Sequence, residues 1–321
     1  MKKILIIGAG AMGAAFAFPC TDNKHKVTLC EPYGISLIKK ILSKKNFHPR
    51  LKLTLPKKLI IKKYSSELLE KKWDLVVVAV SSVGIKSIGE KLKKMKNNNP
   101  ILILTKGLYY QKYENKILTM SEQLNKFVKR GNISVLKGPC LAGELANKIK
   151  TRAVIANKNI NKAKSIGRLI STNYYKFDYS KDIKGVEICS AIKNLYSMII
   201  GSGEGLNTAS ALFRNSISEM VYLTKFFKGK ESTVYGLAGL GDLYVSALGG
   251  RNSKMGKYLG KGFTYKKAKK KFMPKDTVEA AQLAYNIAPY ILKKINNKKI
   301  PLMTNLLKTI SKNKKLNIHW K

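Results

Sequence analysis

Cysteine and histidine are scarce in this chain of 321 residues. The four cysteines are scattered and form no CxxC pair: Cys20, Cys30, Cys140 and Cys189. The three histidines are equally isolated: His25, His48 and His319. Neither residue type clusters as a zinc site or a disulfide framework requires. The sequence therefore predicts a protein without a bound metal, in a reducing cytoplasm.

Long apolar runs are missing as well. No stretch approaches the roughly 20 consecutive apolar residues that a membrane-spanning helix needs, so we predict no transmembrane segment. The hydrophobic content of 45% is ordinary for a folded protein. A chain of this length can bury a large core in one or two domains.

Acidic residues are few: 18 aspartates and glutamates stand against 62 lysines and arginines, which gives a net charge of +44. One explanation is a polyanionic partner such as nucleic acid, and the other is a general bias of composition toward lysine. Only six of the basic residues are arginines, the side chain that nucleic-acid readers favour, and the lysines are spread over the whole chain. A general bias toward lysine is therefore the favoured explanation of the net charge. We expect no specific nucleic-acid partner, and a positive field that attracts a phosphorylated substrate.

Short β-rich runs alternate with helical patterns through the first half of the chain. Strands are predicted at 4–8, 26–31, 58–63, 74–80, 101–105, 133–138, 152–157 and 174–180, with helices at 65–72 and 83–96. After residue 180 only helical patterns follow. The alternation predicts an α/β fold, with a doubly wound, mostly parallel sheet of Rossmann type at residues 1–180 and an all-helical domain at residues 181–321.

The opening run MKKILIIGAGAMG places Gly8, Gly10 and Gly13 directly after the first predicted strand. In a dinucleotide-binding turn, the first glycine permits the tight turn, the second lets a pyrophosphate approach, and the third lets the helix pack closely. A basic start before apolar residues also suits an export signal, but Phe18 and Pro19 stand where a cleavage site needs small residues. The strand, turn and helix context favours the dinucleotide turn.

The second predicted strand ends at Glu31, 18 residues after Gly13. An acidic side chain at this place accepts hydrogen bonds from the ribose hydroxyls of an adenosine, and it repels a 2′-phosphate. Glu31 therefore favours NAD, with NADP as the alternative cofactor. An incidental surface glutamate is the competing interpretation.

Two lysines are notable for their position. Lys106 follows a buried strand in TKGL, at the sheet edge where ligands bind in such folds. Lys193 is the one charged residue of ICSAIKNLYSMIIG (188–201), and an ammonium buried there needs a partner or a lowered pKa. Such a lysine serves well as a general acid or base. A lysine that snorkels from the flank of a helix explains Lys193 equally well, and Lys106 alone is unremarkable in a chain so rich in lysine.

The stretch GLAGLGDLYVSALGGRNSKMGKYLGKG (236–262) is rich in glycine and places Arg251 and Asn252 at a predicted helix start. A guanidinium, an amide and backbone N–H groups together bind an anion well. Asp242 in the same stretch could accept a hydrogen bond from a lysine or from a substrate hydroxyl. The competing interpretation is a structural turn.

Taken in order, GAGAMG, TKGL, GPCLAGE, EICSAIKN, GLAGLGDL, GGRN and TVEAA resemble the NAD-dependent glycerol-3-phosphate dehydrogenase family over nearly the whole chain. The resemblance implies reversible hydride transfer between NAD(P)H and dihydroxyacetone phosphate, which gives sn-glycerol 3-phosphate for phospholipid synthesis, and a homodimer. It implies catalytic roles for Lys193, Lys106 and Asp242. It implies substrate contacts for Lys106, Gly138, Cys140, Lys193, Asp242, Gly250, Arg251 and Asn252. It implies cofactor contacts for Gly8, Gly10, Ala11, Met12, Gly13, Glu31, Lys106, Ala142, Arg251 and Glu279.

The sequence departs from the family's pattern at several positions. Cys140 stands where the family often has Ser or Thr, Gly250 replaces a serine, and Ala280 replaces a glycine. The loop before GGRN is shorter, and no arginine suited to NADP follows the second strand. Because the two lysines, the aspartate and Arg251 are kept, we expect an active enzyme. The alternatives are a related hydroxyacid dehydrogenase with a different small substrate, and a basic nucleic-acid-binding protein on a retired dehydrogenase scaffold.

Overall fold

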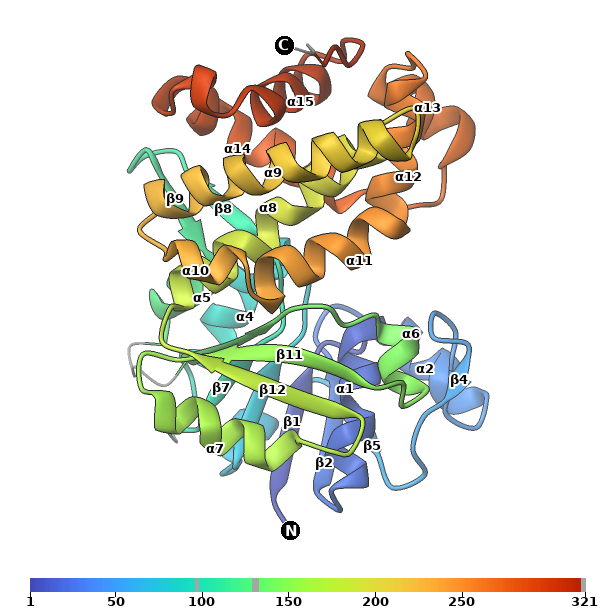
Figure 1. The fold of residues 1–321 in the computed structure, drawn as a ribbon. Coiled ribbons are helices and arrows are strands. Elements are labelled where there is room, and N and C mark those ends of the chain that lie inside the picture. Colours follow the sequence, from blue (N-terminus) through green and yellow to red (C-terminus); the bar gives the residue numbers. More distant parts are fainter. Residues whose placement is uncertain (96–97, 129–132, 319–321) are drawn as a thin grey trace. The chain divides into compact units, whose positions relative to one another are not determined.

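The structure is a computed structural model that describes residues 1–95, 98–128 and 133–318, so His319 lies outside the described residues. The chain forms two compact units (Figure 1). The first comprises residues 1–106 and 120–183, and the second comprises residues 107–119 and 184–321. The domain boundary expected at residue 180 stays a prediction. The compact units differ from it by giving the segment 107–119 to the second unit.

The first unit is built on an eight-stranded sheet with the order β12-β11-β10-β7-β6-β1-β2-β5. Its strands are β1 (Lys3–Ile7), β2 (Lys26–Glu31), β5 (Ile60–Lys63), β6 (Leu75–Val78), β7 (Ile101–Ile103), β10 (Ile133–Lys137), β11 (Thr151–Ala156) and β12 (Tyr175–Ser180). Neighbouring strands are parallel except β10 and β11. The order from β5 to β10 is that of a doubly wound dinucleotide-binding sheet, with its switch point between β1 and β6. The predicted fold class and all eight predicted strands are confirmed.

Helices connect these strands. They are α1 (Ala11–Asp22), α2 (Ser36–Ser43), α3 (Glu67–Glu70), α4 (Ile85–Leu92), α5 (Met120–Asn125), α6 (Ala142–Ala146) and α7 (Ile160–Ile170), with a 3-10 turn at Ser82–Gly84. α1 packs against α6 and α7, while α4 and α5 pack against each other. The helix predicted at 83–96 ends at Leu92, and residue 96 is outside the described residues.

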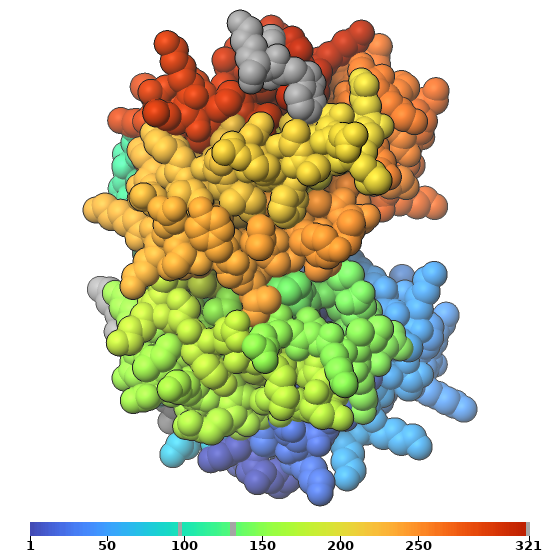
Figure 2. Space-filling view, viewed as in Figure 1, coloured from blue at the N-terminus to red at the C-terminus, as the bar shows by residue number. Residues whose placement is uncertain are grey.

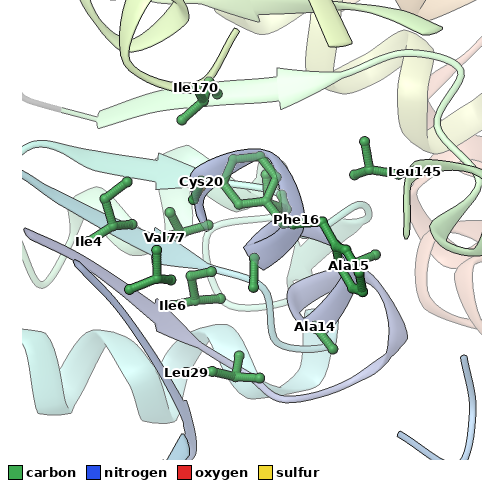
Figure 3. Packing of buried hydrophobic residues seen from close by; sticks show 14 of the residues in the cluster. Ile4, Ile6, Ala14, Ala15, Phe16, Cys20, Leu29, Val77, Leu145 and Ile170 are labelled. Atoms are coloured by element: carbon green, nitrogen blue, oxygen red, sulfur yellow. The ribbon is translucent and has the colours of Figure 1, made fainter. Parts of the chain in front are cut away.

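The core of this unit lies between α1 and the sheet. Figure 3 shows Phe16 of α1 near Ile6 of β1 and Val77 of β6, all without exposed surface. α1 is rich in alanine and glycine, so its axis can approach the strands closely. This packing fixes the start of α1 directly beyond the end of β1.

The second unit is mainly helical. Its helices are α8 (Ile183–Gly201), α9 (Leu206–Phe226), α10 (Glu231–Val234), α11 (Asp242–Leu248), α12 (Arg251–Gly260), α13 (Tyr265–Phe272), α14 (Glu279–Lys294) and α15 (Pro301–Ser311), with a π-helical turn at Leu237–Gly241 and a 3-10 turn at Asn297–Lys299. α8 is buried over most of its length. Side chains of α9, in yellow, lie at the surface of this unit in Figure 2. Among the described residues, no helix is long and apolar enough to cross a membrane.

Two small hairpins were not predicted. β3 (Phe47–His48) pairs with β4 (Leu53–Thr54), and β8 (Leu108–Gln111) pairs with β9 (Lys116–Thr119). The second hairpin packs on α14, where Asn286 donates a hydrogen bond to the Leu108 carbonyl at 3.0 Å. Within the described part of residues 181–321 the structure has helices and helical turns alone, as expected, and the strands of the second unit come from residues 107–119. Short, half-exposed strands lack the continuous apolar run that marks the buried strands of the sheet.

Candidate active site

The glycine turn after β1 has the backbone that its sequence requires. Gly8 has φ +112°, a conformation that L side chains rarely adopt, and a Cβ there would lie 2.7 Å from the Ala79 carbonyl oxygen. A Cβ on Gly13 would lie 1.9 Å from the Gly8 oxygen. A Cβ on Gly10 would meet no atom within 4 Å. The first and third glycines thus serve packing, while the second leaves open space beside the start of α1.

This turn fits a dinucleotide pyrophosphate. Gly10 precedes α1 in an extended conformation, and no side chain caps that helix end. Ala11 and Met12 are the first residues of α1, whose backbone N–H groups have no partner within the helix. Free N–H groups and the helix dipole favour a bound anion. The open space at Gly10 gives such an anion room to approach the backbone.

Glu31 lies next to this turn. One of its carboxylate oxygens accepts a hydrogen bond from the Ala9 N–H at 2.9 Å, and the other accepts one from the Tyr33 N–H at 3.1 Å. The parallel pairing of β1 and β2 places the end of β2 beside the Gly8 turn. A carboxylate has further lone pairs, so Glu31 can hold the turn and still accept ribose hydroxyls.

The other candidates of the first unit lie at the same sheet edge, because they follow the carboxyl ends of parallel strands. Lys106 follows β7, and Gly138 and Cys140 follow β10. Gly138 has φ +120°, and a Cβ there would lie 3.2 Å from the Ala153 Cα. Ala142 is the first residue of α6. The structure therefore brings these residues to the edge that holds the glycine turn.

Lys137 supports this edge and was not predicted. Its side chain is buried, and the ammonium donates hydrogen bonds to the carbonyl oxygens of Thr105 at 2.6 Å and Ile103 at 3.3 Å. The Thr105 hydroxyl in turn donates to the Val80 carbonyl at 2.7 Å. These bonds join the ends of β10, β7 and β6 just before Lys106. In a chain with so many lysines, Lys137 had no signal beyond its place at a strand end.

Lys193 in the second unit is buried rather than snorkelling. It lies in the middle of α8 with 5% of its surface exposed. Its ammonium donates a hydrogen bond to Asp242 at 2.7 Å, and the two side chains form an ion pair that is 6% and 4% exposed. The ammonium also donates to the Ser246 hydroxyl. The sequence left a buried lysine and a snorkelling lysine equally open, and the structure shows the buried one, with Asp242 and Ser246 as hydrogen-bond partners.

The local fold explains how both partners reach Lys193. Asp242 and Ser246 stand four residues apart on α11 and therefore share one face of that helix. The π-helical turn before α11 packs closely, since a Cβ on Gly239 would lie 2.1 Å from the Val234 carbonyl oxygen. Ser246 was missed in the sequence, although its spacing from Asp242 was the signal that could have found it.

Arg251 and Asn252 open α12, as predicted. Gly250 precedes them with φ +102°, and no side chain caps this helix end. The Arg251 guanidinium lies 3.4 Å from Glu279 in a half-exposed ion pair. The Asn252 amide oxygen accepts a hydrogen bond from the Ala280 N–H at 3.1 Å. GGRN and TVEAA, 28 residues apart, therefore meet at the starts of α12 and α14.

Arg251 and Asn252 keep donors for an anion. An exposed ion pair contributes little free energy, so Arg251 can exchange Glu279 for a stronger anion at small cost. The bond to Ala280 uses the amide oxygen of Asn252. The amide nitrogen of the same side chain is a hydrogen-bond donor that suits an anion. A guanidinium, an amide and a helix N-terminus are the donor set that phosphate prefers.

Comparisons with known proteins give matches over most of the chain. Residues 3–163 match the family model described as the NAD-dependent glycerol-3-phosphate dehydrogenase N-terminus, and residues 182–320 match the model described as its C-terminus. An NADP(+)-dependent glycerol-3-phosphate dehydrogenase from Archaeoglobus fulgidus is 30% identical over 83% of this chain and 82% of its own length. A glycerol-3-phosphate dehydrogenase [NAD(P)+] from Fusobacterium nucleatum is 30% identical over 92% of both chains.

A solved structure has the same fold. The crystal structure of glycerol-3-phosphate dehydrogenase from Coxiella burnetii matches with a TM-score of 0.86. The match covers 98% of this chain and 96% of that chain at 24% identity. At this identity, the likeness concerns the fold alone.

Proposed function

The chain belongs to the NAD-dependent glycerol-3-phosphate dehydrogenase family, and on that premise we propose how its residues carry out the reaction. The enzyme is an NAD(P)-dependent oxidoreductase that interconverts sn-glycerol 3-phosphate and dihydroxyacetone phosphate. When bound, NADH or NADPH supplies the hydride for ketone reduction. The protein's own residues bind the two reactants, orient them and deliver the proton.

Lys193 is the proposed acid in ketone reduction and the base in the reverse direction. The observation that carries this role is its buried ammonium, held by Asp242 and Ser246. The pair with Asp242 keeps the ammonium in one orientation, and burial strengthens its electrostatic effect on a developing alkoxide. Lys193 transfers a proton to the oxygen on C2, and Asp242 maintains the position of the amine. Lys106 is proposed to stabilise the same developing charge.

Arg251 and Asn252 are the proposed phosphate ligands. Their place at the start of α12 supports this role, because the helix end adds its own N–H groups. Gly250 has no Cβ to crowd that helix end. Binding energy from the phosphate serves to fix the ketone for reaction. Gly138 and Cys140 are proposed to line the substrate pocket.

The glycine turn is the proposed holder of the dinucleotide. Gly10, Ala11 and Met12 offer backbone N–H groups to the pyrophosphate, and Glu31 accepts the ribose hydroxyls. Lys106, Ala142, Arg251 and Glu279 are the further proposed cofactor contacts. Because a 2′-phosphate would face the Glu31 carboxylate, we expect a preference for NADH over NADPH. Glu31→Gln should lower the ratio of kcat/KM with NADH to kcat/KM with NADPH. An unchanged ratio would refute this assignment.

The role of Lys193 is tested by steady-state oxidation of NADH with dihydroxyacetone phosphate. Lys193→Ala should lower kcat by about 10²-fold or more, because the proton donor is lost. The matched control is Lys225→Ala, which removes an exposed lysine of α9 that pairs with Glu231. Full turnover in Lys193→Ala would refute the proposal.

The phosphate role separates this substrate from another small hydroxyacid. Inorganic phosphate should compete with dihydroxyacetone phosphate in the wild type. Arg251→Ala should raise KM for the ketone and abolish this competition, whereas Arg214→Ala, an exposed arginine of α9, should leave both unchanged. A substrate without phosphate that is reduced equally well by both proteins would favour the related hydroxyacid dehydrogenase.

A cytoplasmic homodimer that supplies a phospholipid precursor is the final part of the proposal. The four cysteines are free thiols, which suits a reducing compartment. The family resemblance supports the dimer. Light scattering coupled to size exclusion checks the oligomeric state, and fractionation of the source cells checks the compartment.

A further inference from the structure

The peptide groups on both sides of Ala9 are held by side chains from elsewhere in the first unit. The Ala9 N–H donates to Glu31 at 2.9 Å. The Ala9 carbonyl accepts a hydrogen bond from His48 Nε2 at 2.9 Å. His48 comes from the β3–β4 hairpin, and its ring has no exposed surface. The sequence marked His48 only as an isolated histidine.

The hydrogen bonds define which nitrogen of His48 carries the proton. The Leu51 N–H donates to Nδ1 at 3.1 Å, so Nδ1 must present a lone pair. Nε2 then carries the hydrogen and donates it to Ala9. This pattern belongs to the neutral imidazole alone, because a protonated ring has a hydrogen on both nitrogens.

The contact with Ala9 bears directly on the glycine turn. The Ala9 carbonyl and the Gly10 N–H belong to one planar peptide group and point in opposite directions. Fixing the carbonyl therefore fixes the direction of the Gly10 N–H. Gly10 has no side chain to restrict its own backbone, and a Cβ there would meet nothing within 4 Å. His48 thus supplies the constraint that Gly10 lacks.

We propose that His48 is a positioning residue for the cofactor, which aims the backbone N–H groups of the glycine turn at the pyrophosphate through the Ala9 carbonyl. This inference rests on the proposed function, because it assumes that the turn binds a dinucleotide. It assigns to the β3–β4 hairpin the task of delivering one buried hydrogen-bond donor to the turn.

The proposal carries a pH dependence. Burial lowers the pKa of His48, and the nearby Arg50 lowers it further, while the bond to Ala9 opposes this shift. Arg50 is the charged side chain that acts on His48 among the described residues. Protonation at acid pH would set an N–H on Nδ1 against the Leu51 N–H and displace the ring from Ala9. Cofactor affinity should therefore fall with decreasing pH below the ordinary histidine pKa of about 6.5.

Two amide substitutions separate the bonds of His48. In His48→Gln the side-chain nitrogen reaches the place of Nε2 and can donate to Ala9. In His48→Asn the side-chain oxygen takes the place of Nδ1 and can accept from Leu51, but nothing reaches Ala9. The matched control is His25→Leu, since His25 has the same pattern at the amino edge of the sheet: Lys2 N–H to Nδ1 at 3.4 Å and Nε2 to the Leu169 carbonyl at 2.8 Å.

The experiment measures the Kd of NADH by fluorescence titration of the full chain from about pH 7.5 to about pH 5.5, around the histidine range. His48→Asn should bind NADH about tenfold more weakly at the higher pH, the size expected for an unsatisfied buried carbonyl. His48→Gln should keep nearly the wild-type Kd and lose much of its acid dependence. His25→Leu should match the wild type in both Kd and pH profile.

The outcomes separate this inference from the proposed function. A wild-type chain that binds neither NADH nor NADPH would overturn the proposed function, and the inference with it. A wild type that binds NADH, with His48→Asn equally tight, would overturn the inference alone. Equal losses in His48→Asn and His48→Gln, with unchanged pH profiles, would show a packing role for the ring and would also overturn it.

Discussion

Glu219 should make the stability of this protein fall as the pH rises toward neutrality. Its carboxyl group is buried between α9 and the start of α15. It accepts hydrogen bonds from the Leu302 N–H at 2.7 Å, the Met303 N–H at 3.0 Å and the Tyr196 hydroxyl at 3.0 Å. The loss of solvent outweighs these three bonds, so burial raises the pKa of Glu219 from 4.5 to about 7.

The sign and size follow from linkage. With a raised pKa, folded Glu219 holds its proton more tightly than the unfolded chain does. Its contribution to stability is fully present below pH 4.5 and is lost as the pH rises to about 7. At 1.36 kcal/mol for each pH unit, the loss across this range amounts to about 3 kcal/mol. Above it, both states are ionised and the contribution stays constant.

The assay compares wild type with Glu219→Gln by urea unfolding, followed by far-UV circular dichroism at several pH values. The glutamine side chain of this variant cannot ionise, so the stability of the wild type relative to the variant should fall by about 3 kcal/mol between pH 4.5 and 7. Other titrating groups, including His48, cancel in this difference. Glu231→Gln, which changes an exposed glutamate paired with Lys225, is the surface control. A flat or rising curve for Glu219→Gln would refute the reasoning.

Four further substitutions test the glycine turn and the buried lysines. Gly13→Ala should lower the free energy of unfolding by about 3 kcal/mol, since its Cβ meets the helix–strand contact, whereas Gly10→Ala should leave unfolding unchanged and weaken NADH binding in a titration. Asp242→Ala should lower the free energy of unfolding by about 3–5 kcal/mol in urea, because the Lys193 ammonium is left buried without its carboxylate. Lys137→Met should lower it by about 1–3 kcal/mol, because two strand-end carbonyls lose a donor, and an unchanged midpoint would contradict this.

The strands of the sheet could be predicted because each is a short apolar run between polar turns. Parallel strands are buried on both faces, which gives runs such as ILII and LVVV a strong signal. The glycine turn could be predicted equally well, because the spacing of its glycines follows from contacts within one strand, one turn and one helix. The β8–β9 hairpin lacked such a signal because its stability comes from α14, far along the chain.

The site could be predicted only in part for a related reason. The motif residues lie at local turns and helix starts, so their backbone roles can be recognised from the residues next to them in the sequence. Ser246, His48 and Glu219 act through contacts 39 to 83 residues distant in the chain, including those to Lys193, Ala9 and Leu302. No local pattern encodes such a partner. Only the helical spacing of Ser246 from Asp242 gave an indirect sign.

Lysine shows most clearly what decides whether a residue is informative. In this chain a lysine is the expected surface residue, so a lysine by itself indicates nothing about function. Lys193 stood out because the residues around it are apolar over several helical turns. An ammonium buried among such residues needs a charged or hydrogen-bonding partner. Lys137 is also buried, but its ammonium donates hydrogen bonds to backbone carbonyls. No sequence pattern predicts such bonds. Contrast with the surroundings, rather than residue type, therefore made Lys193 a candidate, and the family resemblance favoured it as the acid and base of the reaction.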